Sequence, residues 1–347
     1  WLTEDEVKKF DPMDVPIDRA FGYVLEVDLH YPPELHDLHN GFPLAPEKMI
    51  IPHDILSPFA KKLKSDFGLP SCKTPKLMTT FDDKKNYVLH YRNLQLYIRL
   101  GLKLTKIHKI LRFEQSPFMR SYIEFNTEKR KAAKNPFEVD LYKYYNNSVF
   151  GKTMQRQRRQ MSLVLVSDEA KAKRLTAQPN FKKFQIINSD IVAVRSTKRE
   201  IIMNKPLWVG FTVLELAKTV LYSFYYDVLV GRYHLGIRLL FTDTDSVCFA
   251  AKTNDLYSDM EEDRSHYDTS NYSKDHPLYS ATNAKVLGKM KDEASGVPLE
   301  RWVGLRAKLY CLRLKDGSCK VAAKGVQKAY VKRHLKFVRY ERCLFDK

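Results

Sequence analysis

Cysteine is scarce in this sequence, and its pattern excludes two kinds of structural framework. The 347 residues contain five cysteines, at positions 72, 248, 311, 319 and 343, and no Cys-x-x-Cys pair. An odd number of scattered cysteines argues against a disulfide framework and against a structural zinc site. We therefore expect an intracellular protein of a reducing compartment, with a core built by apolar side chains alone.

The sequence also lacks a long uninterrupted apolar run. The longest one, residues 211–230, is broken by Glu215, Lys218, Ser223 and Asp227. It therefore predicts a buried amphipathic helix, and no membrane span is expected. No signal peptide, internal repeat or low-complexity segment is visible. Because the chain begins with Trp1 and not with methionine, we expect it to be a fragment of a longer protein.

The charge of the chain is strongly positive and unevenly distributed. The formal net charge is +18, and the last 47 residues hold 14 Lys and Arg against three Asp and Glu. A tail this basic indicates a track for a phosphodiester backbone with salt-sensitive binding, and the alternative is a merely soluble basic surface. Residues 255–275 are acidic, with seven Asp and Glu against two basic residues, and predict a solvated loop. With 44% hydrophobic residues, the chain can bury a core over two or three subdomains.

Two aspartates lie between apolar segments that predict a β-hairpin. Residues 235–240 and 247–251 read as antiparallel strands, so Asp243 and Asp245 fall in a tight turn, which aspartate tolerates. Two carboxylates aimed at one point favour a hard divalent cation, Mg²⁺ or Mn²⁺. The alternative is that Asp-Thr-Asp-Ser is only a turn.

A third aspartate has a matching setting. Residues 22–28 form an apolar run that ends in Asp28, and Pro32 stops a strand shortly afterwards. A strand-end aspartate beside a hairpin Asp-Thr-Asp is what a two-metal phosphoryl-transfer site requires. The alternative is a solvent-facing strand end.

Two helices are predicted between these segments, at residues 126–134 and 140–152. Arg130 and Lys134 are four residues apart, as are Lys143 and Asn147, so each pair shares a helix face and the basic side chains can clamp a triphosphate. For Arg130 and Lys134 the alternative is a solvated face. Asn147 and the adjacent Ser148 are polar within an apolar helix, which indicates a specific partner.

Taken together, these segments resemble motifs of the family B DNA polymerases. Lys-x-x-x-Asn-Ser-x-Phe-Gly at 143–151 is similar to their motif B, Asp-Thr-Asp-Ser at 243–246 to motif C, and Asp-Leu-His-Tyr-Pro at 28–32 to a form of motif A. Lys-Leu-Tyr at 308–310 resembles the Lys-x-Tyr motif that follows motif C, and Lys-Gly-Val at 324–326 a later lysine–glycine turn. Five motifs in order over nearly the whole chain are a specific signal.

The spacings are similar to those of the protein-primed branch of this family. They are 115 residues from Asp28 to Lys143, 100 from there to Asp243, and 65 from there to Lys308. Within the branch, the segments at 35–40, 43–47, 122–126 and 210–218 resemble polymerases of Polinton (Maverick) transposons and related viruses. A chain of that kind from a eukaryotic element is expected in the nucleus.

The resemblance implies an α+β fold, a right-hand polymerase with an antiparallel palm sheet, helical fingers and a partial thumb. The implied segments are a first palm segment at 1–46, an inserted region at 47–111, fingers at 112–158, a second palm segment at 159–332, and a truncated thumb from 333–347. Residues 191–195 and 200–203 are expected to pair as a β-hairpin. No exonuclease is expected, because only 27 residues precede Asp28.

The resemblance also implies a role for each matched residue. The ligands of two Mg²⁺ ions, which Mn²⁺ can replace, are Asp28, the carbonyl of Leu29, Asp243 and Asp245. The residues that contact the dNTP are Leu29, His30, Tyr31, Arg130, Lys134, Lys143, Asn147, Phe150 and Gly151. Lys143 is also expected to protonate the leaving pyrophosphate. The residues that contact primer–template DNA are Ser148, Ser246, Lys308, Tyr310, Lys324 and Gly325. A terminal priming protein is a further implied partner.

One spacing departs from the family pattern. Most members place the motif A tyrosine five positions after the aspartate, whereas Tyr31 follows Asp28 by three. His30 and Tyr31 are therefore both candidates for the residue that excludes a ribose 2′-hydroxyl.

Three other activities are open to the same residues. A metal-dependent nuclease could use the three aspartates but would have little use for the helix of Lys143, Asn147 and Gly151. A reverse transcriptase is expected to carry Tyr-x-Asp-Asp in place of Asp-Thr-Asp. A co-opted transposon remnant could bind DNA without synthesis.

Overall fold

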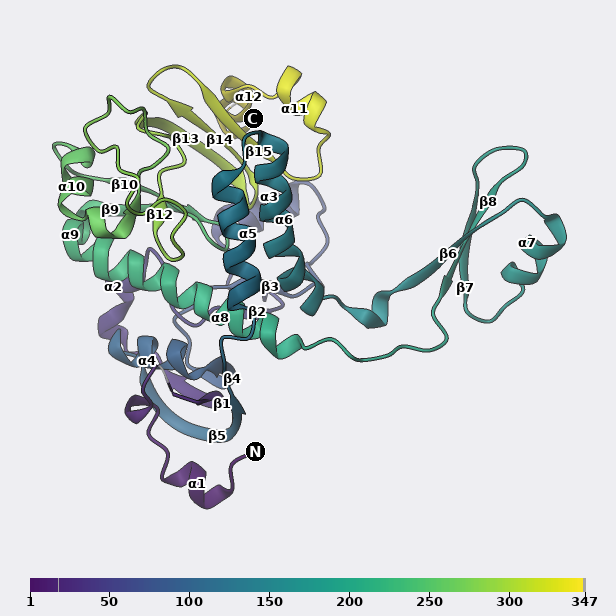
Figure 1. The fold of residues 1–347 in the computed structure, drawn as a ribbon, viewed down its shortest axis with the longest axis horizontal. Coiled ribbons are helices and arrows are strands. Elements are labelled where there is room, and N and C mark those ends of the chain that lie inside the picture. The colour runs from purple at the N-terminus through teal and green to yellow at the C-terminus, as the bar shows by residue number, and fades with distance from the viewer. Residues whose placement is uncertain (18, 346–347) are drawn as a thin grey trace. The chain divides into compact units, whose positions relative to one another are not determined.

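Helices and strands contribute comparably to the chain, and the fold is of the α+β class (Figure 1). The computed structural model describes residues 1–17 and 19–345, so the last two residues of the predicted thumb segment, 346 and 347, lie outside it. The described chain forms two units. Unit 1 comprises residues 1–116 and 216–347, and unit 2 comprises residues 117–215. The predicted second palm segment, 159–332, runs through parts of both units.

Unit 1 holds most of the strands. They are β1 (Phe21–His30), β2 (Glu47–Met49), β3 (Lys76–Met78), β4 (Lys84–His90), β5 (Lys103–Glu114), β9 (Ile237–Thr242), β10 (Val247–Ala251), β11 (Tyr267–Asp268), β12 (Met290–Lys291), β13 (Leu299–Arg306), β14 (Leu309–Leu314) and β15 (Cys319–Ala323). Its helices are α1 (Glu4–Lys8), α2 (His36–His39), α3 (Pro58–Asp66), α4 (Tyr91–Arg99), the π-helix η4 (Phe224–Val230), α9 (Gly231–Tyr233), α10 (Leu256–Glu262), α11 (Lys328–His334) and α12 (Phe337–Phe345).

Strand β1 is the centre of an antiparallel sheet of order β4–β1–β5 (Figure 1). Its side chains alternate between two faces, as a strand requires. Leu25, Val27 and Leu29 point into the core and are at most 1% exposed. The sequence predicts that the strand ends at Asp28, but β1 continues to His30 because its ladder with β5 still pairs His30 with Lys103. Both ladders are irregular around Asp28.

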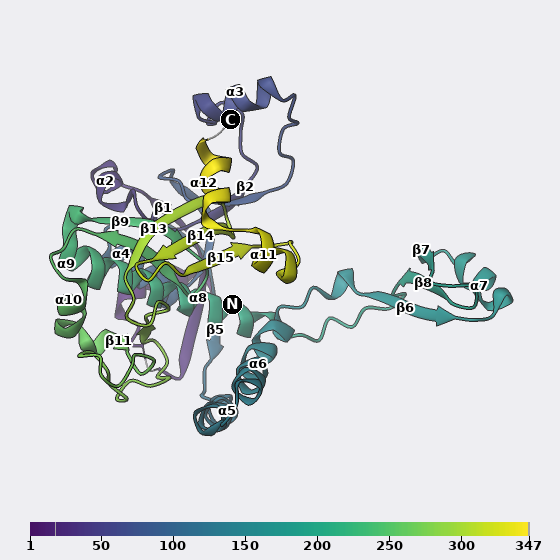
Figure 2. The same ribbon diagram turned by 90° about the horizontal axis from the view of Figure 1, so that it is seen from above.

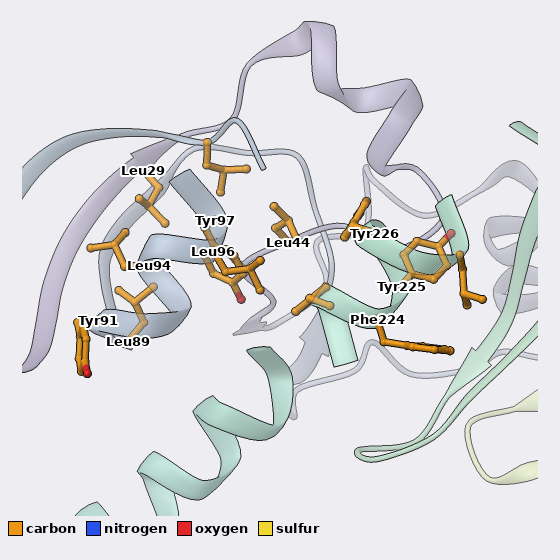
Figure 3. Packing of buried hydrophobic residues seen from close by; sticks show 14 of the residues in the cluster. Leu29, Leu44, Leu89, Tyr91, Leu94, Leu96, Tyr97, Phe224, Tyr225 and Tyr226 are labelled. Carbon is orange, nitrogen blue, oxygen red and sulfur yellow. The ribbon is translucent and has the colours of Figure 1, made fainter. Parts of the chain in front are cut away.

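The core of unit 1 joins segments that are far apart in the sequence. The inward face of β1 packs with α4 and with the aromatic side chains of η4, and Figure 3 shows Leu94 and Tyr97 on one side of this cluster and Tyr226 on the other. At its edge Arg99 and Asp227 form a two-bonded ion pair, at 2.7 and 2.8 Å. The predicted buried helix at 211–230 is therefore confirmed in its second half, although it continues there as a π-helix.

One helical stretch, Leu207–Gly236, runs from unit 2 into unit 1. By its length and composition alone, it could cross a membrane. Within it, Tyr222, Phe224, Tyr225, Tyr226 and Leu229 are buried in the core cluster of unit 1. Burial of this kind is typical of the core helix of a globular domain.

A second sheet of unit 1, of order β13–β14–β15, is covered on one face by α12 (Figure 2). Val303 and Cys311 on that face pack with Phe337 and Tyr340 of the helix. The opposite face carries Trp302, and it also carries Gly304 and Tyr310, which are paired across the ladder.

Unit 2 begins with two helices and continues as a small sheet. Its elements are α5 (Arg120–Ala132), α6 (Pro136–Thr153), β6 (Met161–Val166), α7 (Glu169–Thr176), β7 (Phe181–Ile186), β8 (Val192–Thr197) and the first part of α8 (Leu207–Ser223). The two helices confirm the sequence prediction, with one correction. Lys134 lies beyond the end of α5, so it does not share a helix face with Arg130.

The predicted hairpin of residues 191–195 and 200–203 is wrong in its second strand. Residues 200–203 form no strand, and β8 pairs instead with β6 and β7 in a sheet of order β6–β8–β7. The apolar residues 201–203 misled the prediction because propensity alone does not reveal which partner a strand finds.

The core of unit 1 predicts a large stability difference between two leucines. Leu89→Ala removes a fully buried side chain of β4 and is expected to lower the free energy of unfolding by about 2–5 kcal/mol. The control Leu77→Ala changes a leucine that is 65% exposed, with an expected change within about 0.5 kcal/mol. Urea unfolding followed by circular dichroism measures both, and equal losses would contradict this packing.

Candidate functional site

The turn between β9 and β10 carries Asp243 and Asp245, as the sequence predicts. The N–H of Asp243 donates to the carbonyl of Ser246 at 3.0 Å, and the N–H of Asp245 donates to the carbonyl of Asp243 at 2.7 Å. Between them Thr244 has a φ of 61°, in the left-handed region that β-branched residues avoid. Backbone of this kind costs about 1–3 kcal/mol and is concentrated at functional sites. The turn therefore holds two carboxylates close together at an energetic cost.

Lys308, from the turn between β13 and β14, lies against this pair of aspartates. Its Nζ is 2.9 Å from Oδ1 of Asp243. This hydrogen bond and the charge of Asp243 raise the pKa of the Lys308 ammonium. Lys308 also has a left-handed backbone, with a φ of 59°. The contact joins two predicted motifs that are 65 residues apart in the sequence.

Tyr310 and the lysine–glycine turn lie beside Lys308. The ring of Tyr310 stacks on Phe241 of β9 with centroids 4.3 Å apart. The N–H of Lys324 donates to the carbonyl of Lys308 at 3.0 Å, and Gly325 follows with a φ of 92°, which favours glycine. The fold thus gathers three of the predicted motifs at one place in unit 1.

A pocket opens beside this turn. Its lining comes from the end of β9 and from β13 and β14, and consists of residues 240–243, Trp302, Gly304, Leu305, Arg306, Ala307, Lys308 and Tyr310. Trp302 lies so close over Gly304 that a Cβ added there would be 2.2 Å from the indole ring. Trp302, Gly304 and Arg306 were not predicted as site residues, because a tryptophan two positions before a glycine in a strand carries no sequence signal of its own.

Asp28 lies on the polar face of β1, with its side chain 11% exposed. Its Oδ1 accepts the N–H of Asn86 at 2.9 Å and lies 2.8 Å from Nε2 of His108. Lys85 adds an ion pair at 3.7 Å. The Asn86 and His108 hydrogen bonds hold the pKa of this carboxyl below its usual range. Neither partner was predicted, because each is brought to Asp28 by the pairing of β1 with its neighbours.

The carboxylates have the oxygen donors that Mg²⁺ prefers, but their arrangement does not form a ligand set. Within residues 1–17 and 19–345, no three His, Cys, Asp or Glu side chains are grouped closely enough to hold a metal ion. Asp28 is engaged by His108 and Asp243 by Lys308. Magnesium binding by Asp28, Asp243, Asp245 and the Leu29 carbonyl therefore stays a prediction.

The residues after Asp28 point in different directions. Leu29 is a core residue at 1% exposure. Nδ1 of His30 lies 2.8 Å from Oδ1 of Asp83, and its side chain is 40% exposed. Tyr31 is 2% exposed, and its hydroxyl lies 2.8 Å from Nδ1 of His39 and accepts the N–H of Leu44. Of the two candidates for sugar selection, His30 is thus accessible and Tyr31 is engaged in the core.

The predicted residues of unit 2 lie mostly on α6. Lys143, Asn147 and Gly151 are spaced by four and are all exposed, so they share one accessible helix face. A Cβ added at Gly151 would meet no atom within 4 Å, so packing inside the unit does not require glycine there. The hydroxyl of Ser148 donates to the carbonyl of Tyr145 at 3.0 Å. Phe150 is half-buried on the same helix.

The helix α5 packs against another side of α6. Tyr122 donates from its hydroxyl to the carbonyl of Tyr145 at 3.3 Å, and Asn146 contacts Thr127 at 3.5 Å. Arg130 is half-buried in the last turn of α5. Lys134 is exposed in the connection to α6, where its N–H donates to Glu138.

Comparison with known proteins gives one likeness of fold. No protein-family model matches the chain, and no curated protein matches it. The structure is similar to that of Phi29 DNA polymerase complexed with primer-template DNA, a post-translocation binary complex, with 13% sequence identity and a TM-score of 0.47. The likeness covers 93% of this chain and 47% of the other, so this chain spans about half the length of that polymerase.

The burial of His39 predicts a pH-dependent stability. Burial lowers the pKa of His39 from 6.5 to about 4, so its contribution is complete above about pH 6.5 and is lost as the pH falls toward 4. The loss is at most about 3 kcal/mol. His39→Gln, which keeps a hydrogen-bonding group beside Tyr31, is expected to unfold with a weaker dependence on pH over this range.

Urea unfolding at a series of pH values measures this effect. The exposed His53→Gln is the control and is expected to keep the dependence of the parent chain. Identical pH profiles for His39→Gln and the parent would show that His39 is not the group responsible.

Proposed function

We propose that this chain is the core of a template-directed DNA polymerase, which joins dNTPs to the 3′-hydroxyl of a primer. The finer assignment, to a protein-primed enzyme of a Polinton-like transposon or virus, is part of the same proposal and is supported by the sequence motifs alone. Primer–template DNA and dNTPs are the proposed substrates, and a terminal priming protein is a proposed partner.

One observation carries the proposal. Asp243, Lys308 and the Lys324–Gly325 turn come from three separate segments, and their contacts bring them together around one strained turn. Chance matches to short motifs have no reason to meet in space, whereas parts of one active site do. The aromatic and basic lining of the adjacent pocket suits a nucleic acid strand.

The proposed roles of the side chains follow from their chemistry. Lys308 and Tyr310 hold the primer end, with Lys324, Gly325 and Ser246 beside the strand. Arg130, Lys134 and Lys143 neutralise the triphosphate, and Lys143 gives a proton to the pyrophosphate as the primer oxygen attacks the α-phosphate. Asn147, Phe150 and Gly151 contact the new base pair. Positioning and charge stabilisation account for most of the acceleration of phosphoryl transfer.

We propose Mg²⁺ as the cofactor, held by Asp28, Asp243 and Asp245. The ion would compete with Lys308 at Asp243 and with His108 and Asn86 at Asp28. The exchange at Asp243 is inexpensive, because the ion pair is partly exposed to solvent and surface ion pairs contribute little to stability.

A second candidate function is DNA binding without synthesis, by a decayed or co-opted transposon remnant. It is favoured by the same contacts, because two of the three carboxylates have partners in the chain without a metal: His108 and Lys85 contact Asp28, and Lys308 contacts Asp243. The two candidates differ in whether the chain extends a primer.

Mg²⁺-dependent primer extension on a DNA template separates them. Asp245→Asn is expected to reduce extension at least about a hundredfold. Loss of a residue that only orients a metal ligand lowers activity by about 10–100-fold, and loss of the ligand itself is expected to lower it at least as much. The exposed Asp275→Asn, in the acidic segment after the turn, removes one carboxylate equally and is expected to extend normally.

Three results would redirect the proposal. Extension that survives in Asp245→Asn places the metal elsewhere. Equal loss in both variants shows a general effect of charge. Binding of primer–template DNA without extension by any of the chains supports the remnant.

The ion pair of Lys308 predicts an effect on metal affinity. Lys308→Gln frees Asp243 and is expected to raise the affinity for Mn²⁺ by about fivefold at most, the value of an exposed ion pair. Electron paramagnetic resonance of free Mn²⁺ measures the binding. Lys315→Gln, at the opposite end of β14, removes the same charge and serves as the control, and equal increases in both variants would rule out a direct competition.

A further inference from the structure

The small sheet of unit 2 is covered on one face only. Helix α7 contacts all three strands, β6, β7 and β8 (Figure 2). Val166 and Val194, which lie on the covered face, are 4% and 1% exposed. The sheet therefore has a small core of its own beneath α7.

The opposite face, which we call the open face, carries two exposed leucines beside polar and cationic side chains. The strand register places Leu163, Arg195 and Lys183 in one row across the sheet, and Leu165, Ala193 and Gln185 in the next. Leu163 and Leu165 are 57% and 60% exposed. The same six residues, together with Phe184 and Ile187, line a pocket on the sheet. Exposure of clustered apolar side chains costs solvation free energy, and a patch of this kind marks an interaction site.

Two cationic side chains lie on the open face beside its leucines. Lys183 and Arg195 are exposed direct partners on neighbouring strands. Among the described residues, neither is held in an ion pair. Like charges placed opposite each other in a ladder are destabilising, so their position calls for an anion. The surrounding segment is equally basic, because residues 156–199 contain eleven Lys and Arg against three Asp and Glu.

We propose that the open face binds a single-stranded nucleic acid. A single strand offers both phosphates and uncovered bases, which match a surface where cations alternate with apolar side chains. A duplex offers phosphates but keeps the faces of its bases stacked, so it would leave Leu163 and Leu165 in water. A second copy of this chain would bring a surplus of eight positive charges against another. The inference rests on the proposed function in one respect, since a template supplies the single strand.

Anisotropy of a fluorescein-labelled oligothymidylate, with the full chain, tests the cations. Lys183→Gln with Arg195→Gln removes two phosphate contacts and is expected to weaken binding and to make the slope of log K against log salt shallower by about 1.4. The matched control is Lys171→Gln with Arg174→Gln, which removes one lysine and one arginine from the exposed side of α7. The control is expected to keep the slope. An equal change in both double variants, or no change in either, overturns the inference.

The apolar part of the face has its own test. Leu163→Gln with Leu165→Gln changes no charge and alters side chains that are already exposed, so the sheet keeps its fold. This variant is expected to lose affinity for the oligothymidylate, to keep the salt slope, and to bind a hairpin duplex as the parent does. Equal weakening for the single strand and the duplex would contradict contact with bases.

Two further measurements separate this inference from its alternatives. Light scattering that shows self-association of the parent chain, abolished by Leu163→Gln with Leu165→Gln, would make the face a contact between copies and overturn the proposal. Primer extension tests the proposed function independently. If the chain does not extend primers but the open-face variants still lose single-strand binding, the polymerase assignment is wrong and the inference that the open face binds a single strand is supported.

Discussion

The alternation of side chains along β1 is the constraint on which unit 1 depends. Because β1 is paired on both edges, its side chains project only from its two faces. One face is apolar and the other is polar. Leu25, Val27 and Leu29 supply the centre of the core, while Asp28 emerges on the polar face among side chains of β4 and β5. A shift of one residue in register would place the carboxylate on the apolar face and the leucines on the polar face. The position of the candidate catalytic aspartate is therefore fixed by hydrophobic packing.

Electrostatic compensation is the second organising feature. Two of the three carboxylates implied as metal ligands are partnered by side chains of this chain, Asp28 by His108 and Lys85 and Asp243 by Lys308. Such pairs keep negative charges from repelling each other while no cation is bound. They also set the free-energy difference that a divalent ion must overcome. The metal-free arrangement is thus a competing state with its own contacts.

Much of the local structure follows from the sequence, and the long-range pairing does not. The β9–β10 hairpin is predicted because the turn-forming residues Asp-Thr-Asp-Ser separate two apolar runs. Helices α5 and α6 are also predicted, but the early end of α5 separates Lys134 from Arg130. The contacts of Asp28 with Asn86 and His108 arise from residues 58 and 80 positions away. Pairing over such distances is decided by packing, which leaves no trace in a local pattern.

The contact between Trp302 and Gly304 has a consequence for how this sequence can diverge. The indole ring occupies the space in which any side chain at position 304 would begin. In descendants of this chain, glycine at 304 can be replaced only where tryptophan at 302 has already become smaller or has turned away. The two positions therefore form a coupled pair in which the order of substitution matters. Their joint variation is an evolutionary record of whether the pocket wall has been kept.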